Sequence, residues 1–152
     1  MAADKEILNN RQAYHEFYIL DKYEAGIALV GTEVKSIMAG RIQLKESYVQ
    51  INNGEVWLTG AHISHYSHGN INNHDVLRPR KLLLHRREIE KLEKETTQKG
   101  MTLVVTAIYW KNGRIKFEVG VAKGKKLYDK RETEMRKTIE KETRQQLKER
   151  LR

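Results

Sequence analysis

Alternating apolar and polar residues, interrupted twice by Asn-Gly, are the clearest pattern in the chain. An Asn-Gly pair between two β-rich segments favours a type I′ turn, because both of its central residues take positive φ. The pattern therefore predicts two β-hairpins, the second within a longer pair that covers residues 101–122. The segments are residues 48–52 and 55–59 around Asn53-Gly54, and residues 107–111 and 114–119 around Asn112-Gly113.

Two segments have the apolar spacing of short helices. The first opens at Gly31, has Thr32 as its expected N-cap, and ends at Gly40. The second spans residues 86–98 and is closed by Gly100. Both are short and mostly polar, so we expect them to pack on the strands through one narrow apolar stripe each.

The remaining segments of the folded part lack a clear period. Residues 14–30 are rich in aromatic and aliphatic side chains and predict one bent strand or a strand pair, with Gly26 as a candidate bulge. Residues 60–80 are rich in His and Asn and predict a long exposed loop. Residues 1 to about 12 are polar and without periodicity, and predict an arm that is loose or stabilised by RNA. The fold class is thus mainly β, either an oligonucleotide-binding-like antiparallel barrel with about three helices or a half-open sandwich.

Composition narrows the class of protein. The chain has 152 residues and no cysteine, which excludes disulfides, thiolate catalysis and cysteine-based zinc sites. It contains no apolar run near the roughly 20 residues that a membrane helix needs, and its first residues lack a signal-peptide core. We therefore expect a cytoplasmic monomer with no membrane partner.

Positive charge is concentrated at the C-terminal end. The formal net charge is +9, and residues 123–152 carry twelve Lys and Arg against six Asp and Glu. Such asymmetry indicates an anionic polymer as partner. We therefore expect a domain of residues 1–122 that binds RNA, followed by a basic tail of residues 123–152 that is disordered when free, because its apolar stripe is thin and interrupted.

The start of this tail has the residue types that bind nucleic acid. Cations that hold phosphates surround one aromatic ring that can stack on a base, and a glycine loosens the backbone. The residues are Lys123, Gly124, Lys125, Lys126, Tyr128, Asp129, Lys130 and Arg131.

A second basic segment lies at residues 78–87. Its spacing fits two alternatives, a buried strand or helix start with a solvated rim, or phosphate-binding side chains held by the apolar run 82–84. Its five cations are Arg78, Arg80, Lys81, Arg86 and Arg87.

Signals for catalysis or a metal are weak. The loop around residues 62–74 contains several histidines, but it lacks cysteine and has only Asp75 nearby, which is a poor ligand set. We expect no metal and no cofactor, with these imidazoles facing RNA or solvent. No nucleophile or phosphate-loop motif is present, so we expect no enzyme activity. A nuclease that uses His15 with Glu16 stays open as an alternative.

Eight segments spread over nearly the whole chain carry a resemblance to a known family. They are residues 14–20 (YHEFYIL), 23–27 (YEAGI), 31–37 (GTEVKSI), 39–41 (AGR), 47–49 (SYV), 60–63 (GAHI), 80–84 (RKLLL) and 122–131 (AKGKKLYDKR). In this order they resemble the SsrA-binding proteins, also called small protein B. Members of that family are partners of transfer-messenger RNA in bacterial ribosome rescue.

The resemblance implies a function for each part of the chain. One face of the barrel would bind the tRNA-like domain of transfer-messenger RNA through Asn10, His15, Glu24 and Leu83. Glu24 would accept from a base amine, because phosphates repel a carboxylate. The tail would become helical in the empty mRNA channel of a stalled ribosome, near the decoding centre. Elongation factor Tu and alanyl-tRNA synthetase would be indirect partners through the RNA.

Two rival functions stay open on the residues alone. The first is a generic single-strand-binding or chaperone-like barrel, and the second is the small histidine-dependent nuclease. Competition between a structured RNA and an unstructured one separates the first from an adaptor for one transcript. Incubation with labelled RNA separates the second.

Overall fold

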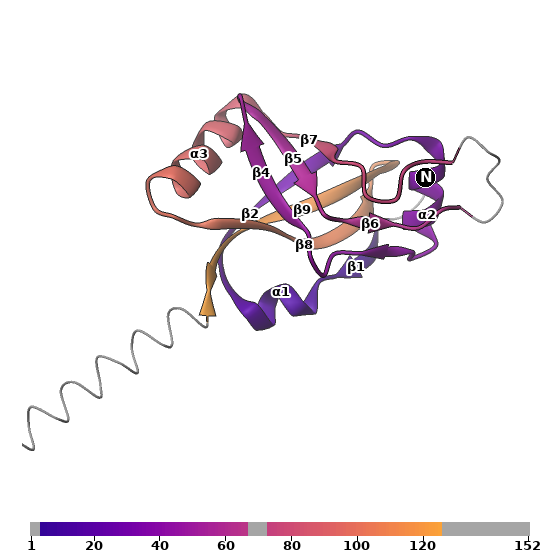
Figure 1. Ribbon diagram of the computed structural model, residues 1–152, viewed down its shortest axis with the longest axis horizontal. Helices are drawn as coiled ribbons and strands as arrows, with labels where there is room; N and C mark the ends of the chain where they lie inside the picture. Colours follow the sequence, from indigo (N-terminus) through magenta and orange to yellow (C-terminus); the bar gives the residue numbers. More distant parts are fainter. Residues whose placement is uncertain (1–3, 67–72, 126–152) are drawn as a thin grey trace, which may run out of the picture.

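The chain forms a strongly curved antiparallel sheet with helices on its outside, in a computed structural model that describes residues 4–66 and 73–125 (Figure 1). The elements in chain order are β1 (Lys5–Asn9), α1 (Arg11–Glu16), β2 (Phe17–Ile27), α2 (Gly31–Met38), β3 (Ile42–Gln43), β4 (Tyr48–Asn52), β5 (Glu55–Thr59), β6 (His62–Ile63), β7 (Arg80–Leu83), α3 (Arg86–Thr97), β8 (Thr102–Lys111) and β9 (Arg114–Gly124).

The strand pairings form a ring. The order in the main sheet is β1-β8-β4-β5-β7-β2-β9, and β9 pairs with β8 as well, so six strands follow one another around the ring and β1 adds to β8. The ring is weakest where β4 meets β8, because these two strands pair only at Val49 and Leu103. This arrangement confirms the mainly β, oligonucleotide-binding-like prediction. A separate two-stranded sheet joins β3 to β6.

Both predicted hairpins are confirmed. Asn53 and Asn112 have φ of 52° and 51°, and each is followed by a glycine with φ of 74°. Two successive residues with positive φ are what a type I′ turn requires. The strand after the second turn, β9, pairs with β8 over the whole length of β8 and then continues to Gly124.

The N-terminal segment differs from the prediction. Residues 5–9, expected in a loose arm, form β1 on the edge of β8, and residues 11–16 form α1 instead of beginning a strand. Asn10 connects the two, because its backbone N–H donates to the Thr106 carbonyl and its side-chain amide donates to the Val105 carbonyl, both at 2.8 Å. These hydrogen bonds join residues that are far apart in the sequence, so local periodicity did not indicate them.

Two finer expectations were also wrong. Of the two alternatives for residues 14–30, the structure has the single strand, β2. Its irregularity lies between Ile19 and Asp21, whereas Gly26 pairs regularly with Leu83. Thr32 does not cap α2. Glu33 reaches back to accept a hydrogen bond from the Val30 N–H at 3.0 Å instead. The other predicted bounds hold, since α2 ends before Gly40 and α3 ends before Gly100.

The main core fills the ring of strands. It consists of inward side chains of the long strands, completed by Ile37 of α2 and Leu92 of α3, both with no exposed surface. A smaller cluster of Ala13, Val104 and Ala122 packs α1 on the outer face of β8 and β9. Gly120 lies in this layer, where a Cβ would come within 2.7 Å of a Thr106 methyl group. A larger residue there would push the strands and their covering apart.

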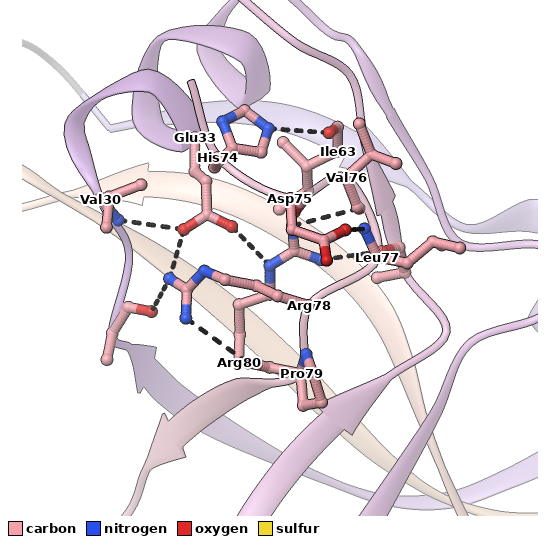
Figure 2. A network of polar contacts seen from close by, with 12 residues as sticks. Val30, Glu33, Ile63, His74, Asp75, Val76, Leu77, Arg78, Pro79 and Arg80 are labelled. Carbon is pink, nitrogen blue, oxygen red and sulfur yellow. Dashed lines mark hydrogen bonds and ion pairs between the residues drawn. The ribbon is translucent and has the colours of Figure 1, made fainter. Parts of the chain in front are cut away.

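A buried ion pair joins α2 to β7. Figure 2 shows the Arg80 guanidinium directed at the Glu33 carboxylate, with Nε 2.5 Å from Oε2 and both side chains fully buried. Arg80 also donates to three backbone carbonyls, those of Ala61, Asp75 and Val76, at 2.8–3.2 Å. Arg78 donates to the other oxygen of Glu33 at 2.5 Å. Both charges therefore have hydrogen-bond partners in place of water.

The environment of Glu33 has two opposing effects on its acidity. Burial alone would raise the pKa of the carboxyl, but hydrogen bonds from Arg78, the Val30 N–H and Arg80 outweigh burial and lower the pKa below its ordinary value of 4.5. Glu33 is thus ionised throughout the neutral range, which the buried guanidinium requires.

Neutralising Glu33 should destabilise the fold. Glu33→Gln keeps the shape of the side chain but leaves the buried Arg80 charge without its counter-charge, so we expect the free energy of unfolding to fall by about 3–5 kcal/mol in urea titrations at pH 7. The matched control is Glu55→Gln, which breaks an exposed 3.8 Å pair with Lys81 and should cost no more than about 0.5 kcal/mol. Equal costs for the two variants would contradict this role.

The same pair of proteins tests the pH dependence. Because the folded pKa of Glu33 is depressed, its contribution is complete above 4.5 and is lost as pH falls through the folded pKa. The gap in unfolding free energy between the wild-type protein and Glu33→Gln should therefore narrow as pH is lowered below 4.5. A gap that stays constant in acid would assign the destabilisation to the altered hydrogen bonding of the amide and not to the lost charge.

Candidate nucleic-acid interface

A groove with a volume of about 780 Å³ runs between β2, the end of β7 and the turn of the β8–β9 hairpin. Glu24 of β2 and Leu83 of β7, two residues of the predicted site, lie in its lining. Leu83 is 51% exposed, although Leu82 beside it is in the core, because successive strand residues face opposite sides. Further lining residues are Leu29, Val34, His85, Trp110, Arg114 and Lys116.

Two carboxylates lie side by side next to this groove. Glu24 of β2 and Glu118 of β9 are direct cross-strand partners. Each is neutralised separately, Glu24 by Lys111 at 3.1 Å and Glu118 by Lys22 at 3.5 Å. Glu118 also accepts a hydrogen bond from the Thr106 hydroxyl at 2.7 Å. Paired in this way, like charges on neighbouring strands are tolerated.

Tyr109 lies close to both carboxylates. Its burial, and then the negative charges of Glu24 and Glu118, raise the pKa of the phenol to about 12. Tyr109 therefore stays protonated at neutral pH and presents a hydroxyl donor on this face. The charged residues in the groove lining are balanced, with Arg114 and Lys116 as cations and Glu24 and Glu88 as carboxylates.

This arrangement has the chemistry of nucleic-acid recognition. An exposed leucine beside aromatic and aliphatic walls offers a contact for a base or a ribose, while Arg114 and Lys116 at the hairpin can hold phosphates. A carboxylate such as Glu24 accepts hydrogen bonds from base amines and repels phosphates. The groove thus combines affinity from cations with selectivity from an acid.

The other two residues of the predicted face lie at α1. His15 is exposed on this helix, and Asn10 is half-buried at its start. The side-chain amide of Asn10 donates to Val105, so one of its donors serves the fold. His15 and Asn10 line neither the groove nor its rim, and the predicted face is therefore brought together only in part, at Glu24 and Leu83.

The basic segment 78–87 divides into residues of different kinds. Arg80 is a correction: it is fully buried and bonded to Glu33, so it offers no charge to a phosphate. Arg78 is partly exposed but also bound to Glu33, and Lys81 faces Glu55 at 3.8 Å. Arg86 and Arg87 are exposed in the first turn of α3. Burial of Arg80 follows from its alternation with Leu82, which gives the two residues the same face of β7.

The predicted tail residues lie partly within the described chain. Lys123 and Gly124 belong to β9, where they pair with Tyr18 and Phe17. Lys125 follows the strand, and its ammonium donates to the Tyr14 carbonyl at 2.9 Å. Five predicted residues lie outside the described residues, namely Lys126, Tyr128, Asp129, Lys130 and Arg131.

The histidines of residues 60–80 differ from the prediction at two positions. His62 is half-buried in strand β6, with its Nδ1 buried. His74 faces neither RNA nor solvent, because it is buried between the Thr32 hydroxyl and the Ile63 carbonyl, 2.8 Å from each. His65 is exposed, and its ring meets that of His74 edge to face. Within residues 4–66 and 73–125, no group of three His, Asp or Glu side chains could hold a metal ion.

The nuclease pair is not assembled. His15 and Glu16 are neighbours on α1, and successive helical residues do not face each other. Glu16 accepts a hydrogen bond from Gln12 instead. In the described part of the chain, no helix has the length and apolar character to cross a membrane.

Several residues of the groove were missed from the sequence. Arg114 and Lys116 line the groove and belong to the predicted second hairpin, where their alternation with buried Ile115 and Phe117 marked them as outward-facing. That signal was present in the sequence. Lys111, at the end of β8, does not line the groove but pairs with the lining residue Glu24. The position of these cations beside Glu24 was not indicated, because it depends on pairing between strands that are far apart in the sequence, with Glu24 and Lys111 separated by 87 positions.

Fold and groove together define an oligonucleotide-binding-like fold whose outer groove combines apolar, cationic and acidic side chains. The family model described as "SmpB protein" matches residues 7–149, and the chain belongs to this family. A protein named SsrA-binding protein from Ligilactobacillus salivarius is 54% identical over 145 residues, covering 95% of this chain and 94% of that protein. Its namesake from Carboxydothermus hydrogenoformans is 57% identical over 129 residues, covering 85% and 87%.

A solved structure gives the same result. It is described as "tmRNA-SmpB: a journey to the center of the bacterial ribosome" and is similar with a TM-score of 0.67 and 45% sequence identity. The match covers 79% of this chain and 85% of that one. Both the fold and the sequence therefore relate this chain to SmpB proteins.

Proposed function

We propose that this protein binds transfer-messenger RNA and brings it to stalled ribosomes for trans-translation in the cytoplasm. The observation that carries this proposal is family membership over nearly the whole chain, together with relatives named for binding SsrA RNA. The protein acts by binding alone and catalyses no reaction. Elongation factor Tu and alanyl-tRNA synthetase meet it only through the RNA.

The groove is the proposed contact for the tRNA-like domain. It places an exposed leucine, an acceptor carboxylate and cations within one surface, as expected for a folded RNA that presents both bases and phosphates. His15 and the exposed cations Arg86 and Arg87 would extend the contact along the backbone. Arg80 takes no part in it except through the fold.

The proposal predicts a strong preference for one folded RNA. In filter-binding competition at fixed salt, the tRNA-like domain should bind on the order of 1,000-fold more tightly than poly(U) of equal length, because non-specific binding rests on phosphates alone. Labelled RNA should remain uncleaved in the same mixtures. Equal affinities would support a generic single-strand-binding barrel instead, and cleavage of the RNA would support the nuclease.

The groove itself is tested with two leucines of equal exposure. Leu83 is 51% exposed in the groove, and Leu77 is 53% exposed outside it. Leu83→Ala should weaken binding of the tRNA-like domain by about tenfold, because it removes an apolar contact at the centre of the interface. Leu77→Ala should change it less than about twofold. Similar losses for both variants would move the interface elsewhere.

The tail is proposed to act on the ribosome and not on the transcript. Truncation after Lys125 keeps every described residue, including the pairs of Lys123 and Gly124 with β2. This variant should bind the tRNA-like domain within about threefold of the full chain, since the groove is intact. It should fail to support peptide tagging in a reconstituted translation assay. Loss of both activities together would show that the tail belongs to the transcript interface.

A further inference from the structure

The end of β9 is fastened to the start of β2 and to α1 by one lysine. Lys125 is the first residue after the strand. Its ammonium lies 2.9 Å from the Tyr14 carbonyl oxygen and 5.1 Å from the centre of the Tyr18 ring. Lys125 is half-buried, so its side chain lies along the barrel and not out in solvent.

The Tyr14 carbonyl has a physical reason to attract a cation. α1 spans six residues, and the last four carbonyls of a helix lack partners within it. These carbonyls carry the negative end of the helix dipole, where a lysine ammonium is favoured. The Tyr18 ring adds a cation–π contact to the same ammonium.

The ring of Tyr14 is held as well. Lys22 lies 5.1 Å from its centre and also pairs with Glu118 of β9 at 3.5 Å. Tyr14 and Tyr18 are still 37% and 38% exposed, so their rings lie at the surface where the chain leaves the barrel. Lys125 thus contacts both tyrosines at the end of β9, through the Tyr14 carbonyl and the Tyr18 ring, and Lys22 contacts the Tyr14 ring.

We propose that Tyr14, Tyr18 and Lys125 form a clasp that sets the direction in which residues 126–152 leave the barrel. Lys125 is then a positioning residue of the protein itself, and its charge serves the clasp before any ribosomal phosphate. The effect on tagging rests on the proposed function, whereas the effect on the direction of the chain does not.

The direction can be measured in the free, full-length protein. Because the chain has no cysteine, Lys91→Cys on the exposed face of α3 and Leu127→Cys just beyond the clasp can carry two spin labels without background. Because residue 127 follows Lys125 by only two positions, distances between the labels should be more narrowly distributed with the clasp than in variants that lack it. Lys125→Met, which keeps the stem but removes the ammonium, should shift or broaden their distribution, and Lys125→Arg should restore it.

Two further variants distinguish an effect of the clasp from an effect of the lost positive charge alone. Tyr18→Leu keeps every tail cation and should broaden the distances as Lys125→Met does. Lys45→Met removes an exposed charge from the loop before β4 and should leave them unchanged. An unchanged distribution in both Lys125→Met and Tyr18→Leu would overturn the clasp.

Tagging gives the second readout. With Lys125→Met and Tyr18→Leu, the rate of peptide tagging should fall by about tenfold while affinity for the tRNA-like domain stays within about threefold. Full tagging by both variants would overturn the positioning role, even if the distances broaden. If the wild-type protein fails to bind the RNA, the proposed function fails, and the distance measurement still decides on the clasp.

Discussion

The buried pair of Glu33 and Arg80 is the interaction on which the groove depends. Glu33 precedes Val34 in α2, and Arg80 stands three residues before Leu83 in β7, so the pair fixes two segments that line the groove. A buried carboxylate and a buried guanidinium tolerate little displacement, because a charge that loses its partner there costs several kcal/mol. Arg80, which the sequence placed at the surface, thus lies in the interior, and in the proposed complex it would act on binding only through the position of Leu83.

The opposite side of the groove depends on β9. This strand pairs with β2 and with β8, and the two ladders align Glu24 with Glu118 and bring Lys111 to Glu24. The same strand carries Arg114 and Lys116 at its start and ends at Gly124, directly before Lys125, which contacts α1. One side of the groove and the start of the basic tail therefore lie on one strand. A displacement of β9 at either end would act on the other end through the same strand.

The sequence predicted what local rules determine. Asn-Gly turns and apolar spacing were sufficient for both hairpins, for α2 and for α3. It did not predict β1 and α1, because Asn10 is held by carbonyls about 95 residues away in the chain. Alternation in β7 placed Arg80 on the face of Leu82, but nothing local named Glu33, 47 residues earlier, as its partner. In the groove, Glu24 and Leu83 were predicted from the family resemblance. The alternation of the second hairpin also indicated its outward-facing cations, but they were not predicted as part of the site.

The pairing of Glu24 with Lys111 explains how an acidic residue can belong to the proposed RNA-binding groove. Both side chains are more than a third exposed, so their ion pair contributes no more than about 1 kcal/mol. In the proposed complex, a base amine can therefore replace Lys111 at Glu24 with little loss, and the released ammonium becomes available to a phosphate. A phosphate that approached Glu24 directly would be repelled. The pair thus favours an RNA whose fold presents a base donor and a phosphate at the spacing of these two residues, which an unstructured strand meets only by ordering itself first.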